Sequence, residues 1–164
     1  MEVLIEKENF LNNNLCDYFI EYHNNNPCDC KHRNTSILYC ENQSSKGDIA
    51  FKFLLKKLNF FAEENKKNTF VNYSQIVEWP TGEDQGEHID FDYHTYTSIL
   101  YLNDNYEGGQ TVVGDKIIQP KKGKIIFFNG NKIKHKVLPI KSGTRYTNPT
   151  WYITKTEENI LNVR

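Results

Sequence analysis

Two segments in the first part of the chain place hydrophobic residues at intervals of three and four, the spacing of one helix face. The first starts near Phe10, has residues 12–14 (three asparagines) as candidate caps and continues to Ile20. The second starts at Gly47-Asp48 and carries the stripe Ile49, Phe53, Leu54, Leu58, Phe61 and Ala62. We predict two helices, the second ending in the polar run 63–68, and between them a loop with one strand at 36–39.

From Thr69 onwards the pattern changes to short β-rich runs separated by Gly, Pro and Asn. These runs predict strands at 69–79, 95–103, 110–113, 116–119, 124–128, 133–138 and 144–154. Gly114-Asp115 is a two-residue hairpin signal, and residues 104–109 form a turn. Helices followed by many short antiparallel strands predict a mainly β (α+β) fold, a sandwich or barrel with helices packed outside.

No internal repeat or linker interrupts the chain, so its 164 residues predict one domain. Helical support is expected over about residues 8–68 and the β core over about 69–155. The net charge of −1 argues against a general nucleic-acid or membrane binder. No signal peptide or transmembrane-length run is visible. We therefore expect a soluble cytoplasmic protein, in the host cytoplasm if its source is a virus.

The chain has four cysteines, at positions 16, 28, 30 and 40. In a reducing compartment we expect free thiols. The order Cys28, Cys30, His32, Cys40 also suggests a zinc site. However, its first spacing is tighter than in zinc fingers and no second pair follows, which favours free thiols over structural zinc.

The strongest candidate chemistry lies at Gly86–Asp90, where His88 and Asp90 are separated by one residue. In an extended strand, side chains two residues apart leave the same face, so both can reach one metal ion. The segment 132–137 alternates lysines with Ile133, His135 and Val137, which should direct His135 inward. Two histidines and one carboxylate form the facial triad of non-haem Fe(II) oxygenases.

Ten residues after His135, Arg145 can also point inward, and a guanidinium binds a carboxylate through two hydrogen bonds while keeping its charge. Tyr101 can offer a hydroxyl to the same carboxylate. A dicarboxylate that chelates metal at one end and meets Arg145 at the other would fit such a pocket.

The region from about Asn72 to Tyr152 resembles the catalytic domain of the prolyl 4-hydroxylase-like Fe(II)/2-oxoglutarate dioxygenases. The resemblance depends on the order and spacing of His88-x-Asp90, Tyr101-Leu102-Asn103, Glu107-Gly108-Gly109-Gln110-Thr111, Pro120-Lys121-Lys122-Gly123, Phe127-Phe128, His135, Gly143-Thr144-Arg145-Tyr146 and Trp151.

This resemblance implies a double-stranded β-helix (jelly-roll, cupin-like) with iron on His88, Asp90 and His135, and 2-oxoglutarate on Tyr101 and Arg145. It also implies O2 as cosubstrate, ascorbate as a candidate reductant, and hydroxylation of peptidyl proline at C4 with release of succinate and CO2. The partner would be a proline-containing peptide or protein. Trp151, Trp79 and His94 are the candidates for substrate contact.

Three positions depart from the family pattern. Trp79 stands where many relatives carry Tyr, and Arg145 where collagen-type prolyl hydroxylases carry Lys. Pro149 interrupts the last predicted strand, so we expect a bulge or an edge position there. His94 follows the alternation of His88 and competes as a metal ligand, but it lacks the His-x-Asp order. His23 and His32 are expected on the surface or in loops.

Three alternatives remain open. A nucleic-acid demethylase of the same superfamily would carry a second Arg six residues after the first, and position 151 is Trp. A hydroxylase of free amino acids is compatible with the same site. A β-helix binding module without catalysis would leave an intact triad unused.

Overall fold

The computed structural model describes residues 3–156. Its helices are α1 (Asn13–Asn25) and α2 (Ile49–Asn65), and its strands are β1 (Leu4–Lys7), β2 (Cys30–His32), β3 (Thr35–Tyr39), β4 (Thr69–Trp79), β5 (Gln85–His88), β6 (Tyr96–Tyr101), β7 (Glu107–Gly108), β8 (Thr111–Val113), β9 (Lys116–Ile118), β10 (Ile125–Phe128), β11 (His135–Val137), β12 (Ile140–Ser142) and β13 (Arg145–Thr154).

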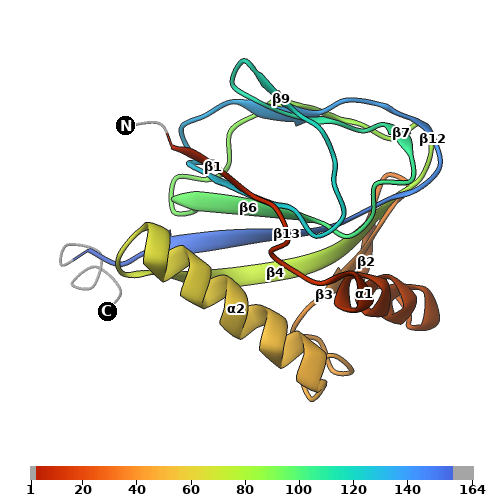
Figure 1. Ribbon diagram of the computed structural model, residues 1–164, viewed down its shortest axis with the longest axis horizontal. Helices are drawn as coiled ribbons and strands as arrows, with labels where there is room; N and C mark the ends of the chain where they lie inside the picture. The colour runs from red at the N-terminus through yellow and green to blue at the C-terminus, as the bar shows by residue number, and fades with distance from the viewer. Residues whose placement is uncertain (1–2, 157–164) are drawn as a thin grey trace.

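Antiparallel sheets form the body of the molecule. The large sheet has the order β1-β10-β6-β13-β4-β3-β2, the small sheet has the order β5-β11-β8-β9, and β12 pairs with β7. Both helices cover one side of the large sheet, and the smaller sheets lie on its other side (Figure 1). This arrangement is the predicted double-stranded β-helix with helices packed outside.

Two hydrophobic cores flank the large sheet. One lies between the sheet and the helices and includes Phe19, Leu58 and Phe127. The other lies between the sheets and includes Ile99, Tyr101 and Phe128. Strand β6 is buried on both faces because it separates these cores. Alternation along β6 therefore directs Thr97 and Ile99 towards the small sheet, where they line a cavity.

Both helices begin at the predicted caps. The Asn12 side chain accepts a hydrogen bond from the Leu15 amide, and the Asp48 side chain accepts from Ala50 and Phe51. The predicted stripe on α2 is correct in its second half, where Leu54, Leu58, Phe61 and Ala62 are buried. It is wrong at its start.

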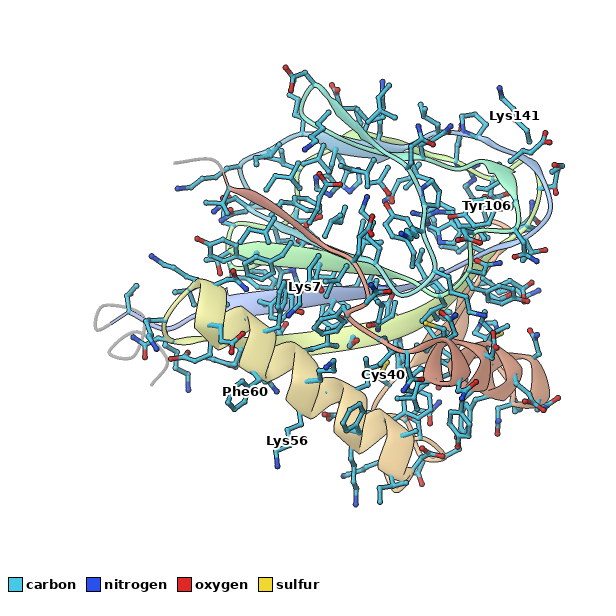
Figure 2. All side chains as sticks on the ribbon, in the orientation of Figure 1. Lys7, Cys40, Lys56, Phe60, Tyr106 and Lys141 are labelled. Carbon is cyan, nitrogen blue, oxygen red and sulfur yellow. The ribbon has the colours of Figure 1, made fainter. Side chains whose placement is uncertain are left out.

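Ile49 is 84% exposed and Phe53 is 49% exposed, while Phe51 is buried instead. Figure 2 shows Phe60 on the side of α2 away from the sheet. Hydrophobic residues of α2 occur on almost every side of the helix, so their spacing does not determine which side packs against the sheet.

Strand β1 was not predicted. Its residues Leu4–Lys7 pair with β10 and close one edge of the large sheet. A four-residue segment has too little periodicity to be distinguished from a loop by sequence. The charge of Glu6 in this strand is satisfied by ion pairs with Lys116 and Lys124.

Two further expectations are wrong. His23 is not a surface residue: it is buried in the last turn of α1, and its Nε2 lies 3.1 Å from the carbonyl oxygen of Ser36. Pro149 lies neither on an edge strand nor at a bulge. Strand β13 is paired on both sides, and its register against β4 shifts only between Trp151 and Tyr152.

Candidate active site

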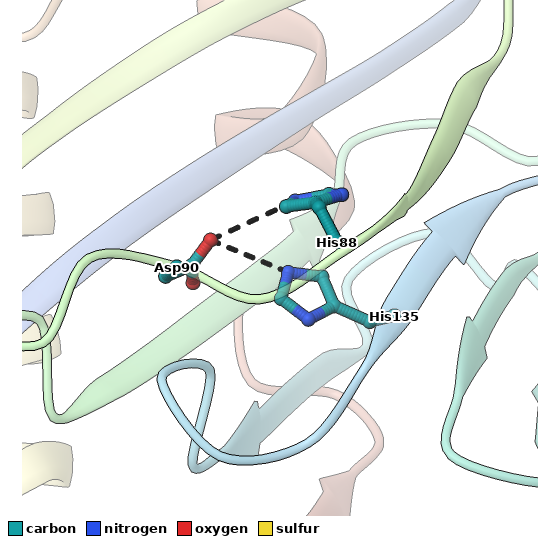
Figure 3. A group of neighbouring side chains, drawn as sticks. All are labelled: His88, Asp90 and His135. Atoms are coloured by element: carbon teal, nitrogen blue, oxygen red, sulfur yellow. Dashed lines mark ion pairs between the residues drawn. The ribbon is translucent and has the colours of Figure 1, made fainter.

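Three side chains with metal-binding atoms gather where the small sheet faces the large one. His88 ends β5 and His135 begins β11, and the two residues are directly paired across these antiparallel strands. Asp90 Oδ1 lies 3.4 Å from His135 Nε2 and 3.7 Å from His88 Nε2 (Figure 3). All three ligand atoms lie within 4.8 Å of one another, and this is the single such group among residues 3–156. The structure therefore brings the predicted triad together.

The backbone conformation that places Asp90 at the site differs from the prediction. Strand β5 ends at His88, and residues 89–95 form a turn-containing loop rather than the strand expected from alternation. The Asp90 amide donates to the carbonyl oxygen of Gly130 at 2.8 Å, which fixes this loop against the neighbouring turn. The carboxylate thus reaches the histidines from a loop.

The donor atoms suit a divalent transition metal. Nδ1 of His88 lies 2.8 Å from the Gly86 carbonyl oxygen, and Nδ1 of His135 lies 2.9 Å from the Ile133 carbonyl oxygen. A carbonyl oxygen only accepts, so both Nδ1 atoms carry the proton and both Nε2 atoms are available as ligands. Two imidazole nitrogens and one carboxylate oxygen are the ligand set typical of non-haem iron.

Asp90 is held as a carboxylate. Burial by itself raises the pKa of Asp90, but its interactions with His135, Thr97 and His88 outweigh burial. The pKa of Asp90 is therefore lowered from its usual value of 3.8. Near neutral pH the group presents a negative charge to any cation between the two imidazoles.

The three side chains line a cavity of about 370 Å³ between the sheets. Its far wall is β13, which contributes alternate residues Arg145, Thr147, Pro149 and Trp151. Arg145 and Trp151 therefore face the same cavity six residues apart, as predicted, and Pro149 does not reverse the register.

At the Arg145 end, the guanidinium is buried without a counterion. Arg145 is 1% exposed, and no carboxylate in the described part of the chain lies within 4.0 Å of it. Nη2 donates to Thr111 Oγ1 at 3.2 Å, and the carbon of the guanidinium lies 5.1 Å from the Trp79 ring centroid. Arg145 Nε and Trp79 Nε1 are both buried without a hydrogen-bond partner among the described residues. An unpaired buried cation is costly, so this end is suited to an anion.

Tyr101 is connected to this end in two ways: the Arg145 guanidinium carbon lies 5.8 Å from its ring centroid, and its hydroxyl contacts Thr111. Its side chain is fully buried and does not line the cavity, and its hydroxyl lies 2.6 Å from Thr111 Oγ1. Burial raises the pKa of Tyr101, so the phenol stays protonated. Sequence reasoning identified Tyr101 but missed Thr111, the hydroxyl that joins it to Arg145.

The opposite end of the cavity is aromatic. The Tyr73 and Trp151 rings stack with centroids 4.6 Å apart and planes 19° apart. His94 is buried beside them, with its Nε2 2.9 Å from Asn72 Oδ1. His94 lines the cavity but does not join the metal-binding group, which supports the choice of His88 and Asp90. Phe91, 67% exposed, extends the aromatic surface to solvent.

Other residues that the sequence did not identify surround the site. Thr97 and Gly130 contact Asp90, and Tyr106 has a buried hydroxyl without a partner among the described residues. Thr97 could have been identified from the sequence, because strand alternation places it on the same face of β6 as Tyr101. Nothing in the local sequence marks Gly130.

The zinc alternative is not supported by the described residues. Cys40 is buried, with its Sγ 3.5 Å from Ser74 Oγ, while Cys30 Sγ lies 3.4 Å from the Tyr39 hydroxyl. All four cysteines are free thiols, as expected. None of them belongs to a group that could hold a metal.

In the described part of the chain, no helix is long and apolar enough to cross a membrane.

Comparisons with known proteins agree with this geometry. Residues 69–153, more than half of the chain, match the family model of the 2OG-Fe(II) oxygenase superfamily. Curated proteins give no match.

Several solved structures are similar. A viral collagen prolyl hydroxylase from Paramecium bursaria Chlorella virus-1, in complex with 2-oxoglutarate, is 22% identical with a TM-score of 0.76, covering 93% of this chain and 96% of that one. A Pseudomonas putida prolyl-4-hydroxylase is 18% identical with a TM-score of 0.73, covering 93% of each chain.

A Trichoplax adhaerens prolyl hydroxylase, in complex with a peptide fragment of the hypoxia inducible factor oxygen degradation domain, is 18% identical. Its TM-score is 0.75, and the match covers 98% of this chain and 87% of that one. At these identities the likeness establishes the fold, and the family model establishes the family. The chain belongs to the 2OG-Fe(II) oxygenase superfamily, and it is a dioxygenase that uses Fe(II), 2-oxoglutarate and O2.

Proposed function

We propose that this dioxygenase hydroxylates proline residues of a polypeptide at C4 and releases succinate and CO2. The observation that carries the proposal is a single cavity with three distinct parts. A His-Asp-His group lies on its wall, a buried guanidinium without a counterion lies at one end, and stacked aromatic rings lie at the other. The prolyl hydroxylases among similar structures support the choice of substrate.

In this proposal His88 and His135 hold the metal through Nε2, and Asp90 holds it through Oδ1. When bound, Fe(II) supplies the redox chemistry by which one oxygen atom of O2 enters succinate and the other enters a C–H bond of the substrate. Three protein ligands leave coordination positions for small molecules. The backbone carbonyls of Gly86 and Ile133 keep both imidazoles in the tautomer that this requires.

Arg145 binds the carboxylate of 2-oxoglutarate that lies farther from the metal. The guanidinium is buried and uncompensated, so an anion at this end removes a large electrostatic penalty. Trp79 Nε1 faces the same end without a partner and can donate one further hydrogen bond. Tyr101 acts through Thr111, which keeps the Arg145 side chain in place.

The polypeptide binds at the aromatic end. Trp151 and Tyr73 offer a flat apolar face, which suits the pyrrolidine ring of proline and requires no charged partner. His94 closes the wall beside them and stays neutral, because burial lowers its pKa. Substrate that extends out of the cavity passes Phe91, whose exposed ring can cover it.

The test is to incubate the protein with Fe(II), 2-oxoglutarate and ascorbate, separately with a library of proline-containing peptides, with free proline and with a methylated oligonucleotide. Succinate and the mass of each candidate substrate are measured in the same reaction. We expect peptides to gain one oxygen atom on proline together with succinate release. Oxygen gain by free proline or the oligonucleotide alone would contradict the prolyl proposal and leave the family unchanged.

A further inference from the structure

We infer that Thr97 and Gly130 position the Asp90 carboxylate so that it offers one oxygen atom, and not two, to the metal. The inference rests on the proposed role of Asp90 as a ligand. It concerns two residues that neither touch the metal-binding atoms of the histidines nor belong to the predicted triad.

The two carboxylate oxygens of Asp90 have different surroundings. Oδ1 faces the imidazoles, 3.4 Å from His135 Nε2 and 3.7 Å from His88 Nε2. Oδ2 accepts a hydrogen bond from the hydroxyl of Thr97. A hydroxyl has a single proton to donate, and that of Thr97 is donated to Oδ2. Oδ2 is therefore engaged by the protein, and Oδ1 is left for the metal.

Thr97 is well placed to hold this orientation. It is 3% exposed and lies in β6, a strand paired on both sides, where Thr97 is opposite Phe128 of β10 and Trp151 of β13. Its hydroxyl position is therefore set by a rigid sheet, while Asp90 lies on a loop. A loop ligand needs such a fixed partner because its own backbone does not determine the carboxylate plane.

Gly130 completes the arrangement from the other side. Its carbonyl oxygen accepts from the Asp90 amide at 2.8 Å, and a side chain at position 130 would overlap both Asp90 Oδ2 and Thr97 Oγ1. Backbone and carboxylate of Asp90 are thus fixed together, and only glycine leaves room for the Thr97–Asp90 hydrogen bond.

The consequence for the metal follows from coordination number. A carboxylate that binds through both oxygens would occupy a fourth position, leaving fewer for 2-oxoglutarate and O2. With Oδ2 retained by Thr97, the protein contributes three ligand atoms. Thr97 is therefore a positioning residue that acts on the metal through Asp90.

The experiment compares Thr97→Val, which removes the hydroxyl and keeps the shape, with Thr97→Ser, which retains the hydroxyl. Binding of Mn(II) to the metal-free proteins is measured by calorimetry, and the absorption spectrum of Co(II)-loaded protein reports the coordination. Loss of an outer partner of a metal ligand weakens metal binding by about 10- to 100-fold. We expect that loss and an altered Co(II) spectrum in Thr97→Val, with Thr97→Ser close to wild type.

Thr150→Val is the matched control. Thr150 is fully buried in β13, and its hydroxyl lies 2.7 Å from Ser74 Oγ on the helix side of the sheet. It should lose stability like Thr97→Val but keep the Mn(II) affinity of wild type. Gly130→Ala should lose Mn(II) affinity as Thr97→Val does.

Equal Mn(II) affinity in wild type and Thr97→Val would overturn the inference, as would a Thr97→Ser protein that binds as weakly as Thr97→Val. Failure of the metal site itself has a different result: wild type and Asp90→Ala would then bind Mn(II) equally.

Discussion

The side-chain amide of Asn148 donates a 2.7 Å hydrogen bond to the backbone carbonyl of Gln75. The register of β13 on β4 runs from Thr147 opposite Val77 to Thr150 opposite Ser74, which sets Pro149 opposite Gln75. Proline has no N–H to donate, so the neighbouring side chain supplies the missing ladder bond. This substitution allows a proline in a central strand and keeps Arg145 and Trp151 on one face.

Asn148→Ala should therefore destabilise the fold by about 1–3 kcal/mol, because the half-buried Gln75 carbonyl and the buried Ser74 hydroxyl lose a donor. Urea unfolding followed by circular dichroism gives the value. Pro149→Ala restores a backbone N–H, so adding it to Asn148→Ala should recover part of the loss. A double variant no more stable than Asn148→Ala would contradict the proposed substitution of one donor for the other.

Removing any one member of the triad should abolish turnover. His88→Ala, Asp90→Ala and His135→Ala each leave two ligands, which weakens metal binding and opens the site. His94→Ala is the control and should retain metal affinity, since His94 lies outside the metal-binding group. Metal binding and succinate release are measured for all four proteins. Metal loss in His94→Ala but not in His88→Ala would reverse the ligand assignment.

Arg145→Ala should raise the 2-oxoglutarate concentration needed for half-maximal rate. Charge-assisted hydrogen bonds contribute about 1.5–3 kcal/mol, which corresponds to roughly 10- to 150-fold. Tyr101→Phe removes one hydroxyl, which is hydrogen-bonded to Thr111, and keeps the charge of Arg145, so its effect should be smaller. The KM for 2-oxoglutarate, measured with substrate held constant, distinguishes these cases. An unchanged KM in Arg145→Ala would exclude the carboxylate clamp.

Trp151→Ala should impair peptide hydroxylation and spare the decarboxylation of 2-oxoglutarate that occurs without substrate. The variant removes one of the two stacked rings at the cavity mouth, a contact of about 0.5–1.5 kcal/mol in addition to the lost apolar area. Succinate and oxygen gain by the peptide are measured in one reaction. If both activities fell while metal and 2-oxoglutarate still bound, Trp151 would have a structural role instead.

The buried His94 should make the stability of the metal-free protein depend on pH. Burial lowers the pKa of His94 from its usual 6.5, although the charge of Asp90 opposes the shift. As the pH falls, the unfolded chain therefore protonates His94 before the folded protein does. The contribution of neutral His94 to the stability of the fold is complete above pH 6.5 and declines as the pH falls below that value.

His94→Phe keeps a ring beside Tyr73 and cannot titrate in this range. Between about pH 7 and about pH 5, metal-free wild type should therefore lose more stability than the variant, as measured by urea unfolding. Parallel pH profiles for the two proteins would show that His94 is not responsible.

The sequence by itself determined the features that depend on local pattern. Alternation in residues 132–137 was sufficient to place His135 inside, because lysines on one strand face must stay in water. The caps Asn12 and Asp48 and the Gly114-Asp115 hairpin were likewise readable, since each depends on a few adjacent residues. The spacing of Arg145 and Trp151 placed both on one face of β13.

Only the tertiary structure decided which surfaces meet. Asp90 reaches the histidines from a loop whose path is fixed by Gly130, a residue 40 positions away in the sequence. The hydroxyl of Thr97 meets Asp90 because the fold brings β6 next to that loop, and Leu4–Lys7 becomes a strand because β10 presents an open edge. Periodicity specifies which residues share a face, whereas the partner of each face depends on contacts between distant segments, which local spacing does not contain.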